Sequence, residues 1–214
     1  LRKTDGAAYA SGPASVWDRW GTLFVAICIV LILALGAFLR FRGLNWDAHQ
    51  HLHPDERFLT MVENSLQWPD SFGEYLDTAQ NPLNPYNQGH GLYVYGLFPI
   101  VAAKFLGELT GRVGYDGVYL VGRALSASLD LACVLLVYLI GRRLYDKWVG
   151  LLAALLLALS VLNIQQSHFF TVDTTTTFFV TLSLYLCVRV AQGSGWGSIL
   201  LLGVSFGLAV ASKV

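Results

Sequence analysis

Five stretches of the chain are almost continuously apolar, and polar or basic segments separate them. The first covers residues 20–39, about the twenty residues that a helix needs to cross roughly 30 Å of hydrocarbon. The others cover residues 118–140, 148–164, 174–190 and 197–212. Each stretch predicts a membrane-spanning helix. We therefore expect an all-α polytopic membrane protein, a bundle of transmembrane helices with a large loop after the first.

The long segment between the first two predicted spans, residues 43–117, also carries a helical pattern. Its apolar positions recur every three or four residues at Phe58, Leu59, Val62 and Leu66. This spacing predicts an amphipathic helix over residues 55–66, of a kind suited to the membrane interface. Pro54 fits at or just before its first turn. The segment is expected to be an ordered loop with interfacial helices rather than a linker.

A further apolar stretch in this loop, residues 91–106, is less regular. It contains the interrupting residues Gly96, Pro99 and Lys104 and the aromatic residues Tyr93, Tyr95 and Phe98. The interruptions and the aromatic side chains favour a segment that lies along the outer surface, or that dips into the membrane and returns. A third complete crossing is the alternative.

The basic residues orient the predicted spans. The short connection 141–148 holds three of them, which the positive-inside rule assigns to the cytoplasm. Basic residues also indicate a cytoplasmic N-terminal segment, residues 1–19, although Arg40 and Arg42 at the other end of the first span weigh against this. Two crossings between these cytoplasmic segments satisfy both assignments. The loop 43–117 is then extracytoplasmic.

Composition narrows the class of protein. Hydrophobic residues make up 55% of the 214 residues and charged residues 13%, against about 45–50% and about 25% in soluble domains. The net charge is zero, and no nucleic-acid or nucleotide-binding motif is present, so we expect no nucleic-acid partner. The chain begins at Leu1 without an initiator methionine and ends just after Lys213, and we interpret it as the N-terminal fragment of a longer protein.

The loop carries its densest polar chemistry in the run His49-Gln-His-Leu-His-Pro-Asp-Glu-Arg-Phe58. Asp55 and Glu56 would lie in the first turn of the predicted helix, where free backbone amides and the helix dipole favour ionised carboxylates. Helix capping alone could explain such a pair. Because alternating histidines precede it, the cluster is also a candidate binding site for a divalent metal or an anionic substrate. His51 and His53 are candidate ligands of a divalent metal, with solvated interface histidines as the alternative.

Three further polar residues lie in or beside the predicted spans. Asp173 ends the short turn 165–173, on the same side as the loop, and could cap the helix that starts at Thr174 as well as serve a site. Asp130 falls near the middle of the second span, where an unpaired carboxylate costs roughly 2.5–3.5 kcal/mol, so it should have a partner. Arg123 lies nearer the outer surface, where it could bind a lipid phosphate or extend to the interface.

These features follow one another in an order that resembles the GT-C glycosyltransferases. The order is a first span, an acidic pair opening an amphipathic helix, an arginine-bearing span, an Arg-Arg loop, and Ser167-His-Phe-Phe-Thr-Val-Asp173 before a further span. The chain is similar in particular to the bacterial group related to protein O-mannosyltransferases and aminoarabinose transferases. Residues 45–58 look like the first-loop motif of that group, and the resemblance covers residues 20–214. It implies a GT-C-like bundle in the bacterial inner (plasma) membrane.

In that family a sugar on a polyprenyl phosphate is moved, on the extracytoplasmic face, to a protein hydroxyl or a lipid. The resemblance implies these as partners, with membrane lipids, and an inverting transfer without a covalent intermediate. It implies that Asp55 is the base that deprotonates the acceptor and that Glu56 and Asp173 are the further acidic positions. Arg123 resembles a family arginine, and we infer that it contacts donor phosphate. The divalent metal suggested by the histidines is the one candidate cofactor.

Residues 81–90 depart from the family pattern, which has a Pro-Pro-Leu-type sequence there, and this leaves donor positioning open. Two other functions also stay open. A glycosyltransferase-derived subunit without activity could scaffold a membrane complex with other subunits. A transporter could use Asp130 and Arg123 as a relay. This portion of the protein alone is expected to be inactive.

Overall fold

The computed structural model describes residues 16–213, and the side chains of residues 21–213. Over this range the chain forms helices and no strand. The long helices are α1 (Val16–Phe41), α5 (Tyr115–Leu144), α6 (Lys147–Ala158), α8 (Val172–Ala191) and α9 (Trp196–Lys213). The others are α2 (Pro54–Ser65), α3 (Phe72–Leu76), the 3-10 helix η1 (Pro85–Gln88), α4 (Phe98–Thr110) and α7 (Val161–Gln166).

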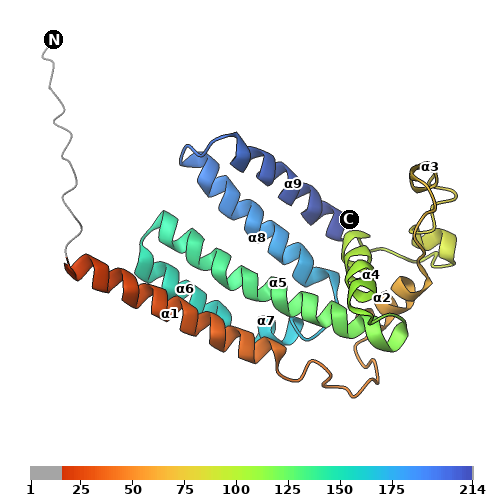
Figure 1. Ribbon diagram of the computed structural model, residues 1–214, viewed down its shortest axis with the longest axis horizontal. Coiled ribbons are helices and arrows are strands. Elements are labelled where there is room, and N and C mark those ends of the chain that lie inside the picture. The colour runs from red at the N-terminus through yellow and green to blue at the C-terminus, as the bar shows by residue number, and fades with distance from the viewer. Residues whose placement is uncertain (1–15, 214) are drawn as a thin grey trace, which may run out of the picture.

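Among the described residues, four helical segments are long and apolar enough to cross a membrane. They are Gly21–Phe41 in α1, Tyr115–Leu144, Val172–Ala191 and Trp196–Lys213. The helix α5 is central, with α1 and α6 on one side and α8 and α9 on the other (Figure 1). This confirms the predicted all-α membrane bundle. Arg2 and Lys3, two of the basic residues of the N-terminal segment, lie outside the described residues.

The predicted span 148–164 is wrong as a single helix, because α6 stops after 12 residues and the chain restarts as α7. The buried Arg40 side chain enters at this break: its Nη1 donates to Ala158 O (3.0 Å) and its Nη2 to Leu157 O (3.2 Å). The last carbonyls of a helix need such partners. A cation from another helix therefore lets α6 end inside the protein, and hydropathy alone does not reveal this.

The same arginine provides the partner that Asp130 requires. Arg40 Nε lies 2.6 Å from Asp130 Oδ2, and both side chains are at most 4% exposed. Asn163 Nδ2 donates to the other carboxylate oxygen at 3.0 Å. A buried charge is costly without its partner. The contacts among Arg40, Asp130 and Asn163 therefore hold α1, α5 and α7 together.

The stretch 91–106 divides into an irregular segment, residues 91–97, and the helix α4. Pro99 lies in the first turn of α4, so it starts the helix rather than interrupting it. With 13 residues α4 is about 20 Å long, too short to cross roughly 30 Å of hydrocarbon. It runs across the ends of α5, α8 and α9 (Figure 1). The third crossing is therefore not formed.

The amphipathic helix predicted over residues 55–66 is confirmed as α2, but its apolar stripe is covered by protein. The buried cluster includes Leu59, Val62 and Leu66 of α2, Ile100 and Ala103 of α4, Val118 of α5, and Phe170 and Val172. The stripe therefore forms the core of the loop of residues 43–117, which we call the outer loop, because α4 and the start of α5 pack over it. This packing attaches the loop to one end of the helix bundle.

One carboxylate of α2, Glu63, lies inside this loop core. It is 5% exposed, and no described residue bonds to its Oε2. Burial raises the pKa of Glu63 to about 7; the Lys104 ammonium opposes this rise and the Glu108 carboxylate reinforces it. The folded protein therefore holds the Glu63 proton more tightly than the unfolded chain, where the ordinary pKa is 4.5.

We expect Glu63→Gln to stabilise the protein at mildly alkaline pH and to change little at acidic pH. A carboxyl whose folded-state pKa is raised contributes its stability below the unfolded value of 4.5 and loses it as the pH rises to about 7. Glutamine does not ionise, so the variant avoids this loss. Its free energy of unfolding at mildly alkaline pH should be higher by about 1–3 kcal/mol, after allowance for solvent screening. Thermal unfolding in detergent at both pH values measures the change. Glu74→Gln, on α3, is the control, and equal effects of both variants would contradict this account.

Candidate functional site

Asp55 and Asp173 come to the same end of the helix bundle. Asp55 is exposed in the first turn of α2, and Asp173 is half exposed in the first turn of α8. Tyr95 lies where the charges of Asp55, Asp173 and Lys213 all act on its hydroxyl. Lys213 forms an ion pair with Asp173. We refer to Asp55, Tyr95, Asp173 and Lys213 as the outer site.

The outer site combines a proton acceptor with a cation. Burial raises the pKa of Tyr95, the Asp55 and Asp173 charges raise it further, and Lys213 opposes them. The phenol therefore keeps its proton at neutral pH and can donate to Asp55. The side chains of Lys213 and Asp173 are 54% and 49% exposed, so a ligand can reach them. Such a set can take a proton from a hydroxyl and stabilise an anionic leaving group.

A close backbone contact places Tyr95 beside Lys213. Gly96 follows Tyr95, and a Cβ at Gly96 would overlap the backbone of Ala211 and Ser212 at the end of α9. Only glycine allows the segment 91–97 to approach α9 so closely. The contact brings the loop and the last turn of α9 into one site.

Glu56, although adjacent to Asp55 in sequence, lies inside the protein. It is fully buried, and it accepts from Arg123 Nε at 2.7 Å and from Arg123 Nη2 at 2.6 Å. Arg123 also donates to both carboxylate oxygens of Asp47, at 3.1 and 2.8 Å, and to Leu44 O at 2.6 Å. These contacts occupy all five N–H donors of the guanidinium group.

This network corrects two sequence predictions. Arg123 does not offer a group to a donor phosphate, because it is fully buried and every donor is used. Glu56 is not an accessible catalytic carboxylate, because it is buried in the same ion pair. The transporter relay also loses its basis, since Asp130 pairs with Arg40 and Arg123 pairs elsewhere.

The buried pair instead positions the outer site. Glu56 Oε1 accepts from Phe170 N at 2.9 Å, and Phe170 lies in the segment that leads into α8 and Asp173. The Phe170 ring packs so closely on Gly122 of α5 that a side chain there would overlap it. Arg123 and Glu56 therefore connect α2, α5 and the start of α8.

Each of the three histidines before the acidic pair has its own contacts within the protein. His49 bonds to the Tyr119 hydroxyl at 2.8 Å. His51 is buried against the rings of Tyr115 and Tyr119. His53 caps α2 through Nδ1. The backbone is left-handed at His49 (φ 68°) and His51 (φ 49°), so this run is not a regular strand, and both side chains contact Tyr119.

No group of three His, Cys, Asp or Glu side chains in the described part of the chain could hold a metal ion. The metal ligation suggested for His51 and His53 therefore has no support from their geometry. Their observed contacts stabilise the loop that carries Asp47 and Asp55.

Asp173 does not cap α8, because the helix begins one residue before it and Thr171 is the N-cap. Its carboxylate pairs with Lys213 instead, and the sequence-based prediction of the site omitted both Lys213 and Tyr95.

The order of the spans could have predicted the contact between Lys213 and Asp173, because neighbouring spans in a chain are antiparallel. The start of one span and the end of the next lie on the same side of a membrane, so residues 173 and 213 should meet. Tyr95 had no comparable signal and was interpreted as an interfacial aromatic residue.

A protein-family model matches part of the chain. Residues 102–214 match the family model of the dolichyl-phosphate-mannose-protein mannosyltransferases. The matched range contains Asp173 and Lys213 and lies downstream of Asp55. No curated protein and no solved structure matches the chain.

Proposed function

Because the chain belongs to the dolichyl-phosphate-mannose-protein mannosyltransferase family, it is a membrane glycosyltransferase of the mannosyltransferase type, and we propose that it moves a hexose from a polyprenyl-phosphate donor to a protein hydroxyl. The reaction takes place at the outer site. The observation that carries this proposal is that the exposed carboxylate of Asp55 and the Asp173–Lys213 ion pair both act on Tyr95, whose neighbour Gly96 packs against the end of α9.

In the proposed reaction Asp55 takes the proton of the acceptor hydroxyl while the acceptor oxygen attacks the anomeric carbon. The bond from that carbon to the donor phosphate oxygen breaks, and polyprenyl phosphate leaves with the bonding electrons. A single displacement inverts the anomeric centre and needs no covalent intermediate. The Tyr95 hydroxyl, which keeps its proton, adds a polar group beside the Asp55 charge.

We assign the donor phosphate to Lys213 in place of Arg123. The Lys213 side chain is 54% exposed and is held by Asp173 beside Tyr95, whereas Arg123 is buried. A fixed cation at this position stabilises the charge that develops on the leaving phosphate. Asp173 thus positions the cation, and Asp55 acts as the base.

The basic loop supports an extracytoplasmic site. Arg142 and Arg143 lie in the last turn of α5, while Arg123 and the outer site lie toward its first turns. The two ends of a spanning helix lie on opposite sides of the membrane, and short basic loops remain in the cytoplasm. On this basis we propose that the outer site faces the extracytoplasmic side of the membrane.

Donor selection by the full-length protein in liposomes tests the proposed function. With a peptide acceptor, we expect transfer from dolichyl-phosphate mannose and none from nucleotide-activated mannose, because the outer site offers one cation and no nucleotide-binding motif occurs in the chain. Nuclear magnetic resonance of the product should show an inverted anomeric centre. Transfer from nucleotide-activated mannose, or retention of configuration, would overturn the proposal. No transfer from any donor would favour the scaffold role.

Lys213→Gln in the same assay should raise the KM for the lipid donor about 10- to 100-fold, the effect of losing one charge-assisted hydrogen bond. Lys213→Arg should recover most of the affinity, and Arg112→Gln, at an exposed position of the outer loop, is the matched control. An unchanged KM for Lys213→Gln would assign the phosphate to another group.

A further inference from the structure

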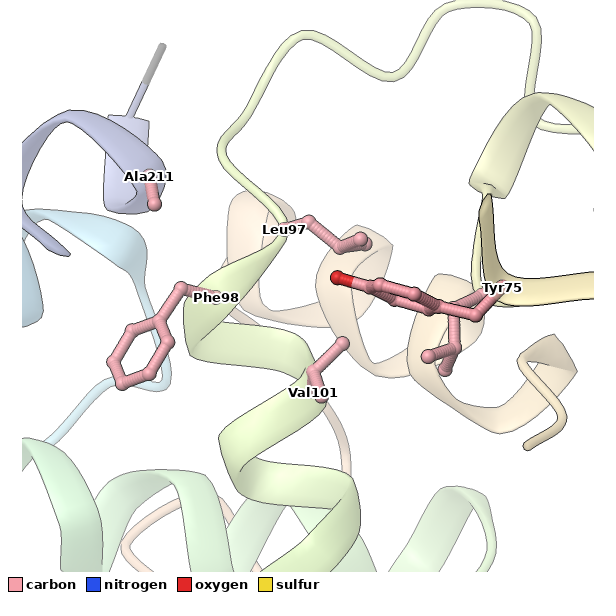
Figure 2. Close-up of a pocket in the computed structure, with 6 residues that line it drawn as sticks. Tyr75, Leu97, Phe98, Val101 and Ala211 are labelled. Carbon is pink, nitrogen blue, oxygen red and sulfur yellow. The ribbon is translucent and has the colours of Figure 1, made fainter. Parts of the chain in front are cut away.

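An apolar cavity of about 430 Å³ opens beside the outer site, between α3, the start of α4 and the end of α9. Its lining residues are Tyr75, Leu83, Leu97, Phe98, Val101 and Ala211. Figure 2 shows the Tyr75 side chain extending toward Leu97 with its hydroxyl at the tip, above Val101. The walls are aliphatic or aromatic, so the cavity suits an apolar group.

The cavity adjoins the proposed base and cation. Leu97 lies two residues after Tyr95, which interacts with Asp55, and Ala211 lies two residues before Lys213. The contact of Gly96 with Ala211 fixes these two walls to each other. A smaller hollow, of about 290 Å³, shares Leu97 and includes Tyr95 itself. A molecule that reacts at Asp55 can therefore reach the cavity with a neighbouring part of its structure.

The position of the cavity favours the acceptor protein over the donor lipid as its occupant. Tyr75 and Leu83 belong to the outer loop, and α4 runs across the ends of the spans (Figure 1). An isoprenoid chain stays in the hydrocarbon among the spans, whereas an acceptor protein approaches from the side of the outer loop. The apolar walls and the single hydroxyl of Tyr75 fit a bulky side chain with its peptide backbone nearby.

We propose that this cavity binds a bulky apolar side chain of the acceptor protein, close in sequence to the hydroxyl residue that receives the sugar. The inference rests on the proposed function, because it assumes a protein acceptor at Asp55. The cavity then determines which serine or threonine residues are modified. A flanking leucine or phenylalanine gains affinity by leaving water, while a flanking glycine or aspartate does not.

A peptide series with the full-length protein and dolichyl-phosphate mannose tests this. Each peptide carries one threonine among alanines, with a single leucine at one of the neighbouring positions. At one or more positions, leucine should raise kcat/KM about tenfold or more over the all-alanine peptide. Val101→Trp, which fills the cavity, should reduce this preference to about twofold and leave the all-alanine peptide unaffected. Leu109→Trp, on exposed surface of the same helix, should keep the full preference.

The outcomes separate this inference from the proposed function. Equal use of all peptides, or a preference that survives Val101→Trp in a variant still active on the all-alanine peptide, overturns the cavity assignment and leaves the transferase intact. Transfer to lipid acceptors with no peptide modified overturns the cavity assignment as well. If Val101→Trp does not fold, Val101→Phe takes its place. Absence of transfer to any acceptor overturns both proposals.

Discussion

Asp55→Asn should lower sugar transfer by about 10²- to 10⁴-fold, the range that a general base contributes. The amide has nearly the shape of the carboxylate but does not accept the proton of the acceptor hydroxyl. Asp55 is exposed and belongs to no ion pair of the buried network, so the variant should fold normally. Single-turnover transfer from dolichyl-phosphate mannose measures the loss, and the KM for the donor should stay close to that of the wild type.

Asp70→Asn is the matched control, because Asp70 is an exposed carboxylate of the same outer loop. It should transfer at the wild-type rate. If Asp55→Asn retains wild-type activity in a protein that binds donor, Asp55 is not the base. Equal losses in both variants would indicate a general effect of charge on the loop.

Arg123→Met should destabilise the protein by at least about 3–5 kcal/mol, the cost of removing one partner from a buried ion pair. Here one cation serves two carboxylates, Asp47 and Glu56, whose side chains are fully buried. Methionine would leave both charges without a partner. The hydrogen bond from Phe170 N to Glu56 would also weaken. Thermal unfolding in detergent, together with the yield of folded protein, measures the effect.

Two further variants separate the buried charge from the lost arginine. Arg112→Met, at an exposed position, should change stability little. Replacing Asp47, Glu56 and Arg123 together by apolar residues of similar volume should restore much of the stability, because no unpaired charge then remains. An Arg123→Met variant that folds normally and only binds donor more weakly would contradict the structural role and support phosphate contact.

The hydrophobic pattern alone predicted most helices of the bundle. A span must have about twenty apolar residues, and this requirement is local in sequence, so residues 20–39, 118–140, 174–190 and 197–212 were found within a few positions of the observed helices. The prediction of a single span over residues 148–164 was wrong because a side chain from another helix binds the carbonyls at the end of α6. Arg40, placed by sequence in a membrane flank, reaches the α6 carbonyls across the bundle.

The sequence alone determined the class of protein, the amphipathic helix α2 and the candidate carboxylates Asp55 and Asp173, because these depend on periodicity and on residue type. Only the tertiary structure decided which charges pair. It buried Glu56 and Arg123 together, exposed Asp55, and brought Lys213 and Tyr95 to Asp173. Ion pairing depends on distances between residues far apart in the chain, and those distances follow from how helices pack, which a linear pattern of apolar residues does not encode.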